Sequence, residues 1–324
     1  MKAAYYDEFG PARDVLRVGE LPAPVAGPGE VLIQMHVSGV NPSDVKSRRG
    51  ARPRVFPRVT PHSDGAGVIV AVGNEVDHAR IGERVWTWNA QWGRPFGTAA
   101  EFVALPGKQA VRLPDGVSFD VGACLGVPWL TAWRSINFRP VVAGESVLVA
   151  GGAGAVGFYA IQLAKRAGLR VIATVSSDEK ARVAWSAGAD QVVNYKTEDL
   201  HEAVHQFADG GVDRVVEVDL AGNAGTYKDI LRKDGLVVAY GSSTWNTQLP
   251  LSDWLVHGIG LNIFIVYELP PQARALALAS SATVLADPDF RHLIAKRFSL
   301  ADIVAAHEAV ESGRLLGNVL VDVA

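Results

Sequence analysis

The sequence predicts an α/β protein of two domains, a β-rich part followed by a doubly wound parallel sheet. From residue 1 to about 115, short β-rich segments such as 30–40, 65–73 and 83–89 are separated by Pro and Gly, which is typical of a compact β-domain or barrel. From about 122 to 265, hydrophobic strands alternate with helical segments. This βαβ pattern indicates a parallel sheet with helices on both faces.

The elements of the alternating part can be placed in order. Strands are expected at 146–151, 170–175, 191–195, 212–218, 235–241 and 261–269. Helices are expected at 158–168, 178–187 and near 198–208. A long helical pattern follows at 270–287, and the segment 306–324 contains a helix and a terminal strand that could return to the first domain.

Composition narrows the classes of partner. The chain has 48% hydrophobic residues and a formal net charge of −3 with basic and acidic residues interspersed, so neither nucleic acid nor an anionic membrane is expected to bind. No segment approaches the roughly 18 apolar residues of a membrane span, and the first ten residues lack an apolar signal core. The only cysteine, Cys124, is expected to be buried and cannot form an internal disulfide. These features favour a cytoplasmic protein.

A glycine-rich turn lies between the first strand and helix of the alternating part. Gly152, Gly154 and Gly157 form the pattern G-x-G-x-x-G, with Ala155 and Val156 inside it. In a dinucleotide site the first glycine allows the tight turn, the second lets a pyrophosphate approach, and the third lets helix and strand pack closely. Glycine turns also join strands to helices without any ligand. The setting after a strand and before a helix favours a pyrophosphate at the helix N-terminus.

The end of the second strand indicates which dinucleotide is bound. A site for NAD places Asp or Glu there, whereas this chain has Val175, Ser176 and Ser177, with Lys180 one turn into the next helix. Hydroxyls and a cation could hold a 2′-phosphate, so NADPH is favoured. Ser176 and Glu179 also match a helix capping box, and we expect both roles because a cap and a phosphate site use the same N–H groups.

Five segments resemble the zinc-free quinone oxidoreductases, the zeta-crystallin-like branch of the medium-chain dehydrogenase/reductase superfamily, over essentially the whole chain. They are SGVNPSDVKSRRG at 38–50, PHSDGAGVIVAVG at 61–73, GVPWLTAW at 126–133, VLVAGGAGAVG at 147–157 and GADQVVNYKTEDL at 188–200. The resemblance implies a GroES-like β-rich domain at 1–121, completed by 268–324, and a Rossmann domain at 122–267. It also implies a homodimer paired through the Rossmann sheet.

The resemblance also implies roles for individual residues. Asn41 corresponds to the asparagine near the nicotinamide ribose, although Asn-Pro is also a common turn. The other implied cofactor contacts are Thr131 beside the nicotinamide phosphate, Ser176, Lys180 and Tyr195 at the 2′-phosphate, Gly241 and Ser242 in a turn, and Phe264 and Val266 in a strand whose backbone meets the carboxamide.

No metal is expected. The zinc-dependent sister branch places Cys and His where this chain has Asn41 and Ser63, and His62 beside them has no partner at ligand spacing. Without a Lewis acid, dehydrogenation of an alcohol lacks its means of lowering the hydroxyl pKa. A quinone or an enone is already electrophilic and can accept hydride directly if the protein positions it and stabilises the developing oxyanion.

Two features bear on the acceptor. Lys46 stands where many relatives have Tyr, and it could donate to a substrate carbonyl or lie on a solvated loop. The segment 85–97 is dense in aromatic residues: Trp86, Trp88, Trp92 and Phe96. We expect core packing to explain some of these rings and an apolar cleft for a flat acceptor to explain the rest.

The sequence therefore predicts an NADPH-dependent, metal-independent reductase of quinones or activated alkenes, with Asn41 and Lys46 as candidate catalytic residues. Enoyl-thioester and haloacrylate-like acceptors stay open within that chemistry. The alternative is a protein of the same fold that binds the dinucleotide and has a structural or RNA-binding role with little turnover.

Overall fold

The computed structural model describes residues 1–53 and 55–323, which divide into two compact units. Unit 1 comprises Met1–Val127, Ser280–Pro288 and His292–Ala324, and unit 2 comprises Pro128–Ala279 and Asp289–Arg291. In the part of the chain that is described, no helix is long and apolar enough to cross a membrane.

Unit 1 is mainly β, as the Pro- and Gly-punctuated pattern predicts. Its strands are β1 (Lys2–Tyr5), β2 (Arg17–Glu20), β3 (Glu30–Val40), β4 (Asp64–Val72), β5 (Arg84–Thr87), β6 (Phe102–Pro106), β7 (Ala110–Arg112), β14 (Ile294–Ser299) and β15 (Asn318–Asp322). Its helices are α1 (Ala12–Val15), α2 (Pro42–Arg48), η1 (His78–Arg80), η2 (Gly107–Gln109), α3 (Phe119–Ala123), η6 (Leu300–Asp302) and α12 (Ile303–Glu311). The π-helical turn η3 (Leu125–Trp129) follows α3.

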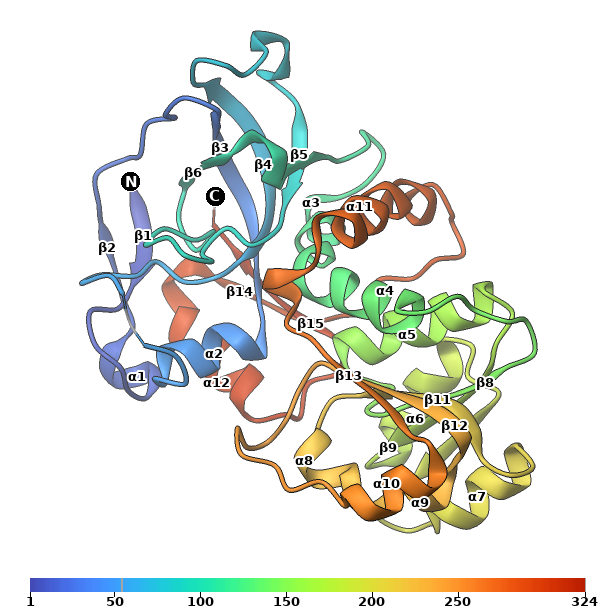
Figure 1. Cartoon of the computed structure of the whole chain (residues 1–324). Coiled ribbons are helices and arrows are strands. Elements are labelled where there is room, and N and C mark those ends of the chain that lie inside the picture. Colours follow the sequence, from blue (N-terminus) through green and yellow to red (C-terminus); the bar gives the residue numbers. More distant parts are fainter. Residues whose placement is uncertain (54, 324) are drawn as a thin grey trace. The chain divides into compact units, whose positions relative to one another are not determined.

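The main sheet of unit 1 has the order β14-β15-β3-β4-β5-β7, with β6 also paired to β3. Strand β15 pairs antiparallel with β3, so the C-terminal strand, red in Figure 1, returns to the sheet of the blue N-terminal strands as the sequence predicts. Alternate residues of β3 face the core, where Val31, Ile33 and Met35 are fully buried. The antiparallel register of β3 and β4 sets Gly39 opposite Asp64. The end of β3 and the start of β4 therefore lie side by side.

Unit 2 alternates strands and helices. Its strands are β8 (Ser146–Val149), β9 (Arg170–Val175), β10 (Gln191–Asn194), β11 (Val212–Glu217), β12 (Leu231–Ala239) and β13 (Gly260–Ile263). Its helices are α4 (Leu130–Asn137), α5 (Ala155–Arg166), α6 (Asp178–Ser186), α7 (Leu200–Phe207), α8 (Leu220–Asn223), η4 (Ala224–Thr226), α9 (Tyr227–Ile230), α10 (Leu251–His257), η5 (Val266–Glu268) and α11 (Pro271–Leu285), whose last turns belong to unit 1.

The sheet of unit 2 has the order β10-β9-β8-β11-β12-β13 and all of its strand pairs are parallel. This is the strand order of a doubly wound Rossmann sheet, and the order reverses between β8 and β11. Helices α5 and α6 contact β9, and α9 and α10 contact β12 (Figure 1). The predicted doubly wound parallel sheet is confirmed.

Several element bounds differ from the sequence prediction: β12, expected at 235–241, comprises Leu231–Ala239, and β13 and α5 differ as well. The expected strand at 261–269 ends at Ile263, because the ladder with β12 stops at Ala239, and Val266 opens the 3₁₀ turn η5 instead. Helix α5 begins at Ala155 rather than 158, because Gly154 already serves as its N-cap. The glycine motif therefore contributes its own residues to the first turn of the helix.

Candidate active site

The three motif glycines of the turn in unit 2 lie in two kinds of environment. A Cβ at Gly152 would lie 2.8 Å from the Cβ of Ala173, and a Cβ at Gly157 would lie 2.3 Å from the carbonyl oxygen of Gly151. These two glycines are buried and allow the close packing of strand and helix. Gly154 is exposed, and its nearest neighbour would be the Gly151 oxygen at 3.4 Å. The open side of Gly154 is thus the place where a ligand can approach the backbone.

Helix α5 begins directly at this open glycine. The N-cap Gly154 has no side chain, so it does not itself cap the N–H groups of the first turn, to which Ala155 and Val156 belong. An uncapped N-terminus of a helix of this length carries a partial positive charge and suits a phosphate group. The geometry of the turn therefore fits a dinucleotide pyrophosphate.

Polar side chains gather where β9 and β10 end. Lys180 Nζ donates to Ser176 Oγ at 3.1 Å, and both side chains are partly exposed. The backbone N–H of Tyr195 donates to the carbonyl of Val175 at 3.1 Å, so the exposed Tyr195 follows β10 beside the end of β9. The parallel register brings Ser176, Lys180 and Tyr195 to one edge of the sheet. No carboxylate of the described chain is hydrogen-bonded to this Ser–Lys pair.

The capping box expected at Ser176 is wrong. The N-cap of α6 is Ser177, whose Oγ accepts from the backbone N–H of Lys180 at 3.3 Å. Ser176 lies one residue before the cap and its hydroxyl bonds the lysine ammonium instead. Ser177 therefore caps α6, and Ser176 is the serine whose hydroxyl bonds Lys180.

Other predicted cofactor residues lie at the same carboxyl edge of the sheet. Gly241 follows β12, and a Cβ there would lie 2.2 Å from the carbonyl oxygen of Val218, so only glycine fits this turn. Ser242 Oγ accepts from the backbone N–H of Ala221 at 3.3 Å. In a doubly wound sheet, ligands bind outside the carboxyl ends of the strands.

Three further predicted cofactor residues differ in accessibility. The Phe264 N–H donates to the Ala239 carbonyl at 3.1 Å, which keeps Phe264 beside the end of β12 although β13 has already ended. Val266 is buried in the 3₁₀ turn η5, so it does not lie in the strand that the sequence predicted for it. Thr131 is buried in α4, where its carbonyl accepts from Ser135 Oγ at 2.8 Å.

Asn41 of unit 1 is the centre of a buried network. It is the N-cap of α2, with Pro42 at the first helical position, so the turn and the functional interpretations of Asn-Pro are compatible. The Asn41 N–H donates to Asp44 Oδ2 at 2.8 Å, and its side-chain Nδ2 donates to Asp64 Oδ2 at 2.7 Å. The same Asp64 oxygen accepts from the Val127 N–H at 2.8 Å. Because β3 pairs with β4, Asn41 just after β3 lies close to Asp64 at the start of β4.

Both carboxyl groups of this network are poorly solvated. Burial raises the pKa of Asp64 to about 8, although the N–H of Val127 and the amide of Asn41 lower it. Burial also raises the pKa of Asp44 to about 7, against the hydrogen bonds from Asn41 and the charge of Arg52. Asp64 Oδ1 is buried without a hydrogen-bond partner among the described residues, and a Cβ at Gly126 would lie 1.9 Å from it. Asn41 is therefore held between two carboxyl groups that take up protons near neutral pH.

The sequence prediction missed this pair of carboxyl groups. Both lie in the quoted segments, Asp44 three residues after Asn41 and Asp64 directly after Ser63, but their meeting depends on strand register. The carboxylate of Asp44 accepts from the backbone N–H of Asn41. Lys46 lies on α2 with an exposed side chain.

His62 is packed rather than solvated. It is fully buried, with Nδ1 2.8 Å from Ser38 Oγ and Nε2 3.0 Å from Nε2 of His307. Burial lowers the pKa of His62 to about 3, so the ring is neutral. Within the described residues, no group of three or more His, Cys, Asp or Glu side chains is arranged to hold a metal ion. Cys124 is buried, as expected.

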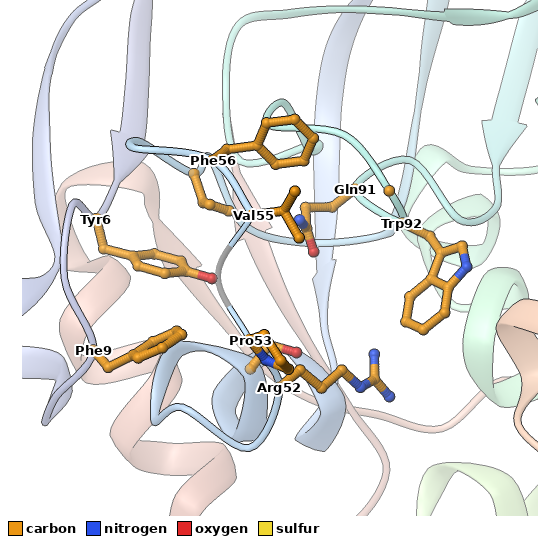
Figure 2. Close-up of a pocket in the computed structure, with 11 residues that line it drawn as sticks. Tyr6, Phe9, Arg52, Pro53, Val55, Phe56, Gln91 and Trp92 are labelled. Carbon is orange, nitrogen blue, oxygen red and sulfur yellow. The ribbon is translucent and has the colours of Figure 1, made fainter.

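Some aromatic side chains of the segment 85–97 lie in the core and others lie at the surface. Trp86 and Trp88 are buried, whereas Phe96 is exposed. Trp92 is partly exposed and lines a cavity in unit 1 with Tyr6 (Figure 2). Core packing accounts for the first two rings, and Trp92 is available to a ligand.

Two models of known protein families match separate parts of the chain. Residues 27–115 match the family model for the alcohol dehydrogenase GroES-like domain, and residues 155–282 match that for a zinc-binding dehydrogenase. The quinone oxidoreductase of Homo sapiens is 30% identical over 320 residues, covering 97% of this chain and 94% of that protein. The quinone oxidoreductase of Pseudomonas aeruginosa is 30% identical over 307 residues and covers 90% of each protein.

Solved structures agree over the whole chain. A mycobacterial protein, Rv1454c, complexed with NADPH, superposes with a TM-score of 0.90 at 28% identity, covering 99% of this chain and 100% of that one. The quinone oxidoreductase of Pseudomonas syringae pv. Tomato DC3000 gives a TM-score of 0.88 at 27% identity and 99% coverage of both.

These matches define an oxidoreductase fold with a GroES-like domain and a Rossmann-like domain. Within that class, the chain belongs to the zinc-free quinone oxidoreductase, or zeta-crystallin-like, branch of the medium-chain dehydrogenase/reductase superfamily.

Proposed function

We propose that the protein is an NADPH-dependent, metal-independent reductase that transfers hydride to quinones or activated alkenes such as enones and enals. In this proposal residues 122–267 bind the cofactor, and residues 1–121, completed by 268–324, carry the catalytic side chains. The observation that carries it is the Ser176–Lys180 hydrogen bond at the end of β9, beside a glycine turn that is exposed at Gly154. The names of the relatives and the NADPH in Rv1454c support the same choice.

Each part of the cofactor has a proposed partner. The N-terminus of α5 takes the pyrophosphate, and the hydroxyl of Ser176, the ammonium of Lys180 and Tyr195 take the 2′-phosphate. The remaining contacts are assigned to Asn41, Thr131, Gly152, Gly154, Ala155, Val156, Gly157, Gly241, Ser242, Phe264 and Val266. Bound NADPH supplies the hydride, and one proton from water completes reduction of the acceptor while NADP⁺ is formed.

The chain's own groups position the reactants. Asp64 and Asp44 hold the side chain and the backbone of Asn41, so its amide is fixed before the cofactor binds. The exposed ammonium of Lys46, on the same short helix, is proposed to donate to the carbonyl oxygen of the acceptor as negative charge grows there. Quinones and enones need no Lewis acid because they are electrophilic already.

We also propose a homodimer paired through unit 2. Strand β13 is the last strand in its sheet, and an unpaired edge is a template for pairing with another chain. Exposed apolar side chains lie on β13 and on α10, the helix that precedes it: Ile263 is 62% exposed, Leu255 73% and Val256 74%. Covering them would remove apolar area from water. The single, buried Cys124 is compatible with the reducing cytoplasm, which we propose as the location.

The test is a panel of quinones, enals and enones with NADPH oxidation as readout. Turnover of at least one acceptor class supports the reductase. Tight binding of NADPH without reduction of any acceptor would instead support the alternative, a dinucleotide-binding protein with a structural or RNA-binding role.

A further inference from the structure

A chain of buried hydrogen bonds in unit 1 leads from α12 to the start of β4. His307 Nε2 lies 3.0 Å from His62 Nε2, and His62 Nδ1 lies 2.8 Å from Ser38 Oγ. Ser38 Oγ lies 2.7 Å from Thr98 Oγ1, whose hydroxyl donates to the backbone carbonyl of Asp64 at 2.5 Å. All four residues that lead to Asp64 are fully buried. Bulk water therefore cannot replace these bonds.

The direction of this chain follows from its last bond. A carbonyl oxygen only accepts, so the Thr98 hydroxyl uses its single hydrogen on Asp64 and accepts from the Ser38 hydroxyl. Ser38 then has no hydrogen left for the imidazole of His62. His62 Nδ1 therefore carries a hydrogen and donates it to Ser38.

The tautomers of both imidazole rings follow from this direction. Burial lowers the pKa of His62 to about 3. Burial, and then the nearby groups His62 and Arg48, lower the pKa of His307 well below its ordinary value, so both rings are neutral. A neutral His62 with its hydrogen on Nδ1 has a lone pair on Nε2, and this lone pair accepts from the Nε2–H of His307. His307 is thus the first donor of the chain.

The opposite direction would leave two polar groups without a partner. It would place a hydrogen on His307 Nδ1, which is buried and has no hydrogen-bond partner among the described residues. It would also turn the Thr98 hydroxyl toward Ser38, and the Asp64 carbonyl would lose this donor. Each buried polar group without a partner costs free energy. The N–H that His307 offers to His62 therefore selects the direction of the whole chain.

The backbone at His62 is strained and is held by the neighbouring segment. Its φ of 78° lies in the left-handed region, which is uncommon for residues other than glycine. Its carbonyl accepts from the Thr98 N–H at 3.0 Å, and a Cβ at Gly97 would lie 2.2 Å from the same oxygen. Strain of this kind persists where the surroundings over-determine a conformation, and it clusters at functional sites. Asp64 follows this strained residue by two positions.

Asp64 connects the chain to the candidate active site. Its carbonyl takes the Thr98 hydroxyl, and its carboxyl oxygen Oδ2 accepts from Asn41 Nδ2 at 2.7 Å and from the Val127 N–H at 2.8 Å. Holding the Asp64 backbone fixes the point from which its side chain extends. The carboxyl group in turn orients the amide of Asn41, and a supporting shell of this kind determines how precisely a functional side chain is placed.

We propose that His307 is a positioning residue for the amide of Asn41. Its N–H fixes the tautomer of His62, and this tautomer directs the two hydroxyl groups of the chain toward the Asp64 carbonyl. Without a donor at position 307, His62 can take the other tautomer, and the hydroxyl groups can turn away from Asp64. The consequence for reduction rests on the proposed function, because Asn41 is assigned to the cofactor there.

The orientation of the amide is tested by NMR on the full chain without cofactor. With isotope-labelled asparagine, the side-chain signal of Asn41 is the one lost in Asn41→Ser, which keeps an oxygen that can cap α2. His307→Leu removes the first donor and should shift this signal. His307→Gln should restore it, because glutamine carries an N–H donor at the same number of bonds from Cα as His Nε2. Thr98→Val interrupts the chain at its other end and should also shift the signal, so it provides the same test if His307→Leu does not fold.

Ile303→Val is the matched control. Ile303 is a buried apolar residue one turn before His307 on α12, so this change weakens the packing of the same helix without removing a member of the chain. It should lower Tm and leave the Asn41 signal at its wild-type position. Circular dichroism melting curves check that each variant is folded. An Asn41 signal that is unchanged in His307→Leu and Thr98→Val, or that shifts as far in Ile303→Val, would overturn the inference.

Cofactor binding then separates this inference from the proposed function. His307→Leu should raise the Kd of NADPH about tenfold, and His307→Gln should raise it much less. In the Asn41→Ser background His307→Leu should have no further effect, because its effect passes through Asn41. The same rise in Kd in both backgrounds would contradict action through Asn41. If NADPH does not bind, or binds without reduction of any acceptor, the proposed function is wrong, and a shift of the Asn41 signal in His307→Leu that His307→Gln reverses still supports the positioning role.

Discussion

Replacing Asp64 by Asn should stabilise the protein at high pH and change little at low pH. Asp64 Oδ2 accepts from Asn41 Nδ2 at 2.7 Å and from the Val127 N–H at 2.8 Å. An asparagine at 64 can offer its carbonyl oxygen to both donors, and its NH₂ would replace Oδ1, which has no hydrogen-bond partner in the described structure. The amide therefore imitates the protonated acid and cannot become charged.

The magnitude follows from the pKa. Burial raises the pKa of Asp64 from 3.8 to about 8, so between these values the folded protein holds a proton that the unfolded chain releases. The stabilisation from this proton is complete below 3.8 and is lost as the pH rises to about 8. At about 1.4 kcal/mol per pKa unit, the wild type loses roughly 6 kcal/mol of unfolding free energy across this range. Asp64→Asn should not suffer that loss.

Urea denaturation followed by circular dichroism measures the effect. At about pH 4 the wild type and Asp64→Asn should agree within about 1 kcal/mol, and at about pH 9 the variant should be several kcal/mol more stable. Asp115→Asn, which replaces an exposed carboxylate of the same unit, is the matched control and should show no such change with pH. The same difference between wild type and Asp64→Asn at both pH values would show that the folded protein does not hold an additional proton on Asp64.

Four further outcomes are expected. Lys180→Ala should remove much of a preference for NADPH over NADH, by about 1–3 kcal/mol for a charge-assisted contact, and equal affinities in the wild type would contradict the cofactor choice. Lys46→Met should lower kcat/KM while leaving NADPH affinity nearly intact, and unchanged kcat/KM with both a quinone and an enone would remove Lys46 from the site. Gly154→Val should weaken NADPH binding with little change in Tm, because its Cβ has room, whereas Gly157→Val should lower Tm; equal NADPH affinity of Gly154→Val and wild type would place the pyrophosphate elsewhere. Dialysis against a strong chelator should leave turnover unchanged, and activity lost on chelation and restored by zinc would contradict a metal-independent reaction.

The sequence predicts the sheet of unit 2 because its signals are local. Each strand is a short hydrophobic run, each helix has its own period, and the βαβ alternation fixes parallel pairing. The glycine motif is equally local, since Gly152, Gly154 and Gly157 all act within one turn. The position at which β13 ends is not determined by a local signal. It depends on where the partner β12 stops, at Ala239, and nothing in residues 264–269 signals it.

The buried network around Asn41 could not be read from spacing. Its members belong to separate motifs, and the register of β3 against β4 brings Asn41 and Asp64 together. The predicted N-cap of α6 is wrong by one residue. Ser176 and Ser177 are chemically equivalent, and only the backbone direction selects Ser177. Propensity places the cap to within a residue, and the fold decides which hydroxyl is left for Lys180.

Turnover of an acceptor by the purified full chain is the most direct test of the proposed reductase activity. Oxidation of NADPH is followed spectroscopically with naphthoquinone and with an enone, and each reaction is repeated with NADH. We expect acceptor-dependent oxidation of NADPH, a lower rate with NADH, and loss of the difference in Lys180→Ala. Saturable binding of NADPH with no acceptor-dependent oxidation for any quinone, enal or enone would contradict the proposed activity.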